Sequence, residues 1–71
     1  MRIRTQKVTN EQKDYSQMVD EYNHSRNNWK TYQKNLKEVT ENELINYYLY
    51  MIKAEEARLA YLQKKMREAD V

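Results

Sequence analysis

The sequence predicts an all-α protein, an antiparallel hairpin of two helices over about residues 10–38 and 41–69 that dimerises into a four-helix bundle. Three observations predict it: the 71 residues contain neither Gly nor Pro, apolar residues follow a heptad spacing, and a helix-start signal lies mid-chain. Tight turns and strand edges depend on Gly and Pro, so their absence excludes an all-β domain or a doubly wound sheet. It also excludes glycine-rich phosphate-binding loops.

The first helix is predicted from apolar residues at the a and d positions of a heptad repeat. Residues seven apart in the first half are all apolar: Val8, Tyr15, Tyr22, Trp29 and Leu36. Companion positions three residues later carry Met18, Tyr32 and Val39. Glu11 and Ser25 interrupt this pattern.

A new helix is predicted to start at Glu41. Thr40 and Glu43 have the spacing of a capping box, and Val39 and Leu44 have the spacing of a hydrophobic staple. The alternative is one unbroken helix of about 60 residues, because no Gly or Pro stops the first helix.

The second helix carries two apolar stripes. The broader one, expected to pack on the first helix, contains Leu44, Ile45, Tyr48, Met51, Ile52, Leu59, Leu62, Met66 and Ala69. Beside it lies a second stripe, here called the tyrosine face: Tyr47, Tyr50, Ala54, Ala57 and Tyr61. One partner helix covers only one stripe, so we expect the tyrosine face to be a homodimer interface or a surface that binds another protein.

Glu55 falls inside the apolar face of the second helix, opposite the weak part of the first. We expect a buried polar layer of Glu55, Ser25 and Arg26 that fixes the register of the helices, with Arg26 or the Trp29 ring nitrogen as the partner of Glu55. The alternative is that Glu55 contacts a ligand or a partner protein.

The net charge is +2, and the basic residues are unevenly distributed. Residues 1–8 are predicted to be a flexible basic arm preceding a single domain over residues 9–71. The segment 22–37 contains no acidic residue and presents the basic stripe of Arg26, Lys30, Lys34 and Lys37. The basic stripe, with Arg2 and Arg4 of the arm, is a candidate contact for an anionic partner; the alternative is a solvated outer face.

No residue pattern predicts catalysis. The chain has no Cys and a single histidine, His24, and the neighbouring Ser25 points about 100° away along a helix. We therefore expect no enzymatic activity, metal, cofactor or small-molecule substrate. No apolar run approaches a membrane span or a secretory signal, so we expect a cytoplasmic protein without membrane contact. The abundance of Lys, Asn, Tyr and Gln suggests an AT-rich bacterial or phage genome.

One stretch has a family likeness. Tyr15, Trp29 and the run from Tyr48 to Leu62, with its Ala-Glu-Glu-Ala-Arg core, resemble the YaaL-like small proteins of spore-forming Gram-positive bacteria over roughly residues 15–66. That family has no assigned biochemical activity, so the resemblance implies a bacterial or phage origin.

Together these features favour a non-enzymatic protein-interaction module that acts through helical surfaces, such as an adaptor, an assembly factor or an inhibitor of a host or phage protein. The alternative is a nucleic-acid-associated protein that uses the basic stripe and the N-terminal arm.

Overall fold

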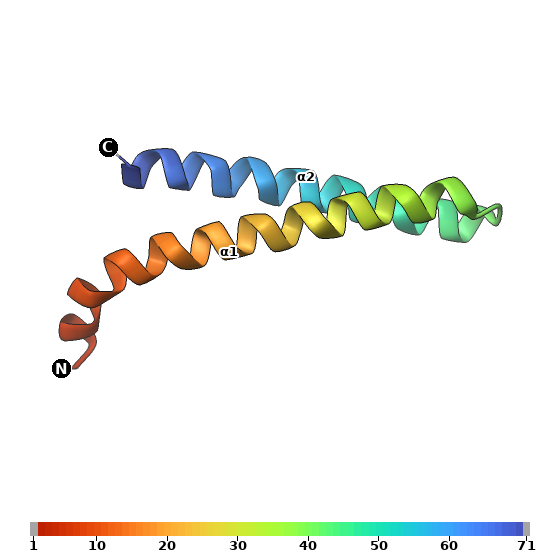
Figure 1. Cartoon of the computed structure of the whole chain (residues 1–71). Helices are drawn as coiled ribbons and strands as arrows, with labels where there is room; N and C mark the ends of the chain where they lie inside the picture. The colour runs from red at the N-terminus through yellow and green to blue at the C-terminus, as the bar shows by residue number, and fades with distance from the viewer. Residues whose placement is uncertain (1, 71) are drawn as a thin grey trace.

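The computed structural model describes the backbone of residues 2–70 and the side chains of residues 15–69. It contains two helices, α1 (Arg2–Glu38) and α2 (Asn42–Asp70). The chain reverses direction at residues 39–41, so the helices run antiparallel and both ends of the chain lie at the same end of the hairpin (Figure 1). The described residues form no strand, and the predicted all-α hairpin is confirmed.

The first helix starts earlier than the sequence suggested. We expected it near residue 10, but α1 begins at Arg2, so the backbone of the predicted arm is helical. Arg, Gln and Lys have high helix propensity, and no Gly or Pro interrupts this segment. The side chains of Arg2 and Arg4 lie outside the described residues, and the mobility of the arm stays a prediction.

The hydrophobic core of the hairpin is thin. Among the described side chains only Ile52 and Leu62 are buried apolar residues, with exposed fractions of 8% and 3%. The expected apolar heptad residues from Met18 onward are half-buried: Met18, Tyr22, Trp29, Tyr32 and Leu36 of α1, and Val39 at the reversal. Two helices can enclose little volume, so most of their apolar side chains keep contact with solvent.

Aromatic packing fixes the helix pair near the turn. The rings of Tyr32 and Tyr48 lie 6.1 Å apart between centroids, and Tyr47 packs edge-on against Tyr48 at 5.0 Å. Asn35 donates a hydrogen bond from Nδ2 to the Tyr48 hydroxyl at 3.5 Å. The ring contacts anchor α2 to α1 about two helical turns from the reversal.

The start of α2 lies one residue later than predicted. The Ile45 amide donates to the Glu41 carbonyl at 2.9 Å, which places Glu41, and not Thr40, at the N-cap position. The reversal occupies residues 39–41 and therefore leaves Thr40 outside the first turn. Leu44, which was expected to form a hydrophobic staple with Val39, is 39% exposed.

The cap position predicts the effect of two substitutions. Glu41→Asp keeps the charge and introduces a preferred N-cap side chain, so it should raise the free energy of unfolding by about 0.5–1 kcal/mol. Thr40→Ala should change it by less than about 0.5 kcal/mol, since an exposed residue outside the helix contributes little. Urea denaturation of the two variants measures both effects. A loss of about 1 kcal/mol in Thr40→Ala would instead show that Thr40 caps the helix.

Candidate interaction surface

A cluster of polar side chains, here called the Glu55 cluster, occupies the middle of the helix contact. Ser25 is fully buried and donates from Oγ to Oε1 of Glu55, which is itself only 8% exposed. Asn28, one turn along α1, donates from Nδ2 to Oε2 of Glu55 at 3.3 Å. Each oxygen of the buried carboxyl group thus has a donor from the facing helix.

The burial of Glu55 explains why its carboxyl group has two hydrogen-bond donors. Burying a carboxyl group without donors costs free energy, and hydrogen bonds from the facing helix offset much of that cost. Sliding α2 by one turn would separate Glu55 from Ser25 and place an apolar side chain against the hydroxyl. The Glu55 cluster therefore specifies one register, as a buried polar residue does in a coiled coil.

One residue of the predicted polar layer is different in the structure. Ser25 and Glu55 meet, but Arg26 is exposed and lines a shallow groove beside Trp29 and Glu56. Arg26 follows Ser25 directly and projects about 100° away from it around the helix. Asn28 takes its place, because a residue three positions along a helix shares the face of Ser25. The i, i+3 spacing of Ser25 and Asn28 is the feature of the sequence that indicates this partner.

The side chain of Trp29 also has a different partner from the one expected. Its ring nitrogen donates to Oε2 of Glu56 at 3.1 Å, on the exposed flank of the hairpin. On the other flank Arg58 of α2 lies 3.7 Å from Glu21 of α1, with both side chains about half exposed. These flanking contacts agree with the register set by Glu55.

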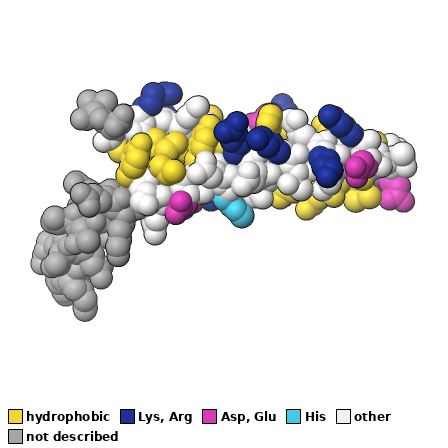
Figure 2. All heavy atoms as spheres, in the orientation of Figure 1, with side chains coloured by type: hydrophobic (Ala, Val, Ile, Leu, Met, Phe, Trp, Pro, Cys, Tyr) yellow, Lys and Arg dark blue, Asp and Glu magenta, His cyan; other side chains and the backbone are white. Residues whose placement is uncertain are grey.

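The tyrosine face lies exposed on α2. Tyr50 is 77% exposed, Tyr61 58% and Tyr47 49%, and Ala54 and Ala57 are also exposed. In Figure 2 hydrophobic side chains reach the surface both near the open end of the hairpin and near the turn. A surface with several exposed large aromatic rings is typical of a binding site for another protein.

The four side chains of the basic stripe are all exposed on α1. Among residues 15–69 the ion pairs join Arg58 to Glu21 and Lys65 to Glu68, and neither involves the basic stripe. The stripe is therefore available to solvent or to an anionic partner.

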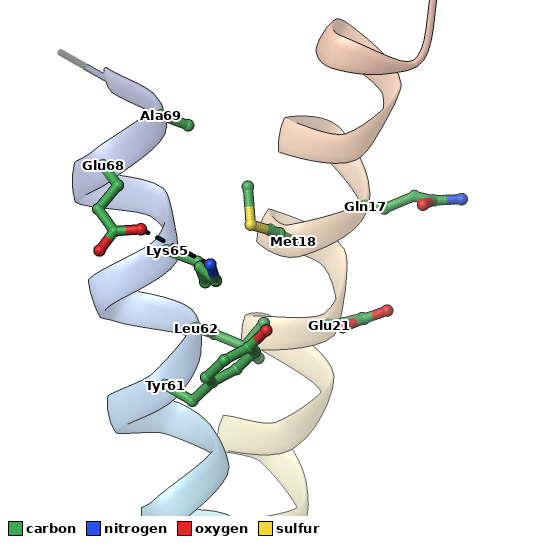
Figure 3. Close-up of a pocket in the computed structure, with 8 residues that line it drawn as sticks. All are labelled: Gln17, Met18, Glu21, Tyr61, Leu62, Lys65, Glu68 and Ala69. Carbon is green, nitrogen blue, oxygen red and sulfur yellow. Dashed lines mark ion pairs between the residues drawn. The ribbon is translucent and has the colours of Figure 1, made fainter. Parts of the chain in front are cut away.

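A groove with a volume of about 520 Å³ lies between the helices at their open end. Met18 of α1 points toward α2, whereas Tyr61 and Leu62 of α2 point toward α1; Gln17 and Glu21 point away (Figure 3). Lys65 lies 3.7 Å from Glu68, and its Nζ is 5.9 Å from the centre of the Tyr61 ring. The lining is mainly apolar with a charged rim.

Neither helix, over its described residues, carries an apolar stretch of the length and hydrophobicity that crossing a bilayer requires. The part of the chain that the structure describes holds no group of three His, Cys, Asp or Glu side chains placed to bind a metal ion. His24 is exposed on α1.

Comparisons with protein-family models, with curated proteins and with solved structures find no match to this chain. The resemblance to the YaaL-like proteins therefore stays a prediction, and the site rests on the geometry described above.

The Glu55 cluster predicts a non-additive pair of substitutions. Ser25→Ala leaves Oε1 of Glu55 buried without its donor, which should lower the free energy of unfolding by about 1–3 kcal/mol. Adding Glu55→Leu removes the unmet acceptor and supplies apolar contact, so the double variant should recover most of that loss.

Urea denaturation at one fixed protein concentration measures this cycle. Asn27→Ala, on the exposed side of α1, is the matched control and should change stability by less than about 0.5 kcal/mol. Equal stability of Ser25→Ala and the control would show that the Glu55 cluster does not hold the helices together.

Proposed function

We propose that this chain is a non-enzymatic protein-interaction module whose binding surface is the tyrosine face of α2. The observation that carries the proposal is the exposure of Tyr47, Tyr50 and Tyr61 along one face of a helix that is already packed against α1 on another. A stable monomer gains nothing from large apolar rings in solvent, whereas an interface gains contact area and hydrogen bonds from them.

The rest of the tyrosine face fits this role. Ala54 and Ala57 lie between the aromatic residues and are exposed, so another helix can approach the backbone of α2 closely there. The tyrosine rings on either side would flank such a helix. Adaptors, assembly factors and inhibitors all work through surfaces of this kind, and the proposal covers that class.

Affinity capture with matched variants tests the proposal. We expect the tagged wild type to retain at least one protein. An untagged copy of this chain counts as such a protein. Retention should fall at least about tenfold in Tyr50→Ser/Tyr61→Ser, which removes the two most exposed rings. Lys30→Ser/Lys34→Ser, on the opposite helix, should retain that protein as the wild type does. Equal retention by wild type and the tyrosine variant would overturn the proposal.

The alternative function is nucleic-acid association, which the exposure of the whole basic stripe favours. In the same experiment that alternative predicts the reverse pattern. The lysine variant would lose the captured material, nuclease treatment would release it, and the tyrosine variant would keep it. The cytoplasmic location and the bacterial or phage origin stay predictions.

A further inference from the structure

We propose that the occupant of the tyrosine face is a second copy of this chain, bound with its α2 antiparallel to the first and with the two-fold axis passing beside Ala54. The inference rests on the proposed function, since it takes the tyrosine face to be a binding surface, and it names the partner.

Two of the three aromatic residues of the tyrosine face are spaced symmetrically about Ala54. Tyr47 lies seven residues before Ala54 and Tyr61 seven residues after it, so all three share one face about two turns apart. In an antiparallel pair centred there, Tyr47 of each copy lies opposite Tyr61 of the other. A two-fold interface needs such a self-complementary surface.

The centre of the face is small. Ala54 is exposed and meets its own counterpart at the axis, which allows the two α2 helices to approach to about 8 Å. The larger side chains on either side then pack beside the partner helix. A bulky residue at the axis would hold the helices apart, because it would meet itself.

Charges at the ends of the face select the antiparallel direction. Glu43 lies eleven residues before Ala54 and Lys65 eleven residues after it, and eleven residues are about three helical turns. Both side chains are exposed. The antiparallel pair places Glu43 opposite Lys65 at both ends, whereas a parallel pair would place like charges together.

Lys65 is able to take part in this contact. Its ion pair with Glu68, at 3.7 Å with both side chains about half exposed, is a surface pair that contributes little by itself. Tyr61 lies beside Lys65 on the rim of the open-end groove. Tyr47 of the second copy therefore arrives next to the apolar lining of that groove.

The exposed area of the chain exceeds that of a compact monomer by more than one standard interface removes from each partner. The accessible surface is 6084 Å², whereas a compact monomer of 8.8 kDa has about 4,800 Å². A stable interface of standard size removes about 800 Å² from each partner. Dimerisation through α2 would thus remove more than half of the roughly 1,300 Å² by which the exposed area of the chain exceeds that of a compact protein.

Disulfide trapping tests the position of the axis, because the chain has no cysteine of its own. Ala54→Cys should form a covalent dimer on mild oxidation, since facing Cβ atoms at the axis come within disulfide reach. Ala60→Cys is the matched control: it is also an exposed alanine of α2, but it projects about 120° away and should stay largely unlinked. Equal linking of both variants, or of neither, would overturn the proposed axis.

Reciprocal charge reversal tests the direction. By sedimentation equilibrium, Glu43→Lys alone and Lys65→Glu alone should each weaken dimerisation by roughly tenfold, because each change creates two like-charge contacts per dimer. The double variant Glu43→Lys/Lys65→Glu should restore the wild-type dimer. Failure of the double variant to recover would contradict the antiparallel pairing. Circular dichroism of each variant checks that the helices remain folded.

The two proposals fail differently. A monomeric wild type that still captures another protein through Tyr50 and Tyr61 would refute the homodimer and leave the interaction module standing. A monomeric wild type whose captured proteins are unaffected by the tyrosine variant would refute both.

Discussion

The hydrogen bond from Ser25 to the buried carboxyl group of Glu55 is the contact on which the rest of the hairpin depends. It joins the two helices at the middle of their contact, with Asn28 as the second donor. Apolar side chains at heptad spacing pack almost equally well after a slip of one turn, but a buried hydroxyl and a buried carboxyl group do not. The polar pair therefore selects one alignment, and the flanking contacts of Trp29 and Arg58 follow from it.

This alignment also decides which surfaces remain uncovered. With Glu55, Ile52 and Leu62 turned toward α1, the helical repeat turns Tyr50 toward solvent and leaves Tyr61, 58% exposed, on the rim of the open-end groove. The same rotation leaves the basic stripe on the outer side of α1. The hairpin is thus a thin scaffold with two chemically different helical faces, one aromatic and one cationic, and that division is the basis of the proposed interaction function.

The sequence predicts the hairpin because its signals agree: the heptad pattern, the lack of Gly and Pro, and the cap-like segment before α2. The partner of the Trp29 ring nitrogen is predicted to within one residue, since Glu56 and not Glu55 accepts its hydrogen bond. The cap residue is missed, because the geometry of a three-residue reversal depends on how the packed helices meet. The sequence points to Arg26 because its charge suggests an ion pair, whereas the angular position around α1 brings Asn28 to Glu55.

The central claim is that the helices have one register, set by the Glu55 cluster, and an NMR spectrum tests it most directly. The chain has a single tryptophan, so the indole N–H proton of Trp29 gives one resolved signal. We expect nuclear Overhauser effects from that proton to the side-chain protons of Glu56. Absence of effects to Glu56, with the effects from that proton confined to a neighbouring turn of α2, would show a slipped register and contradict this register.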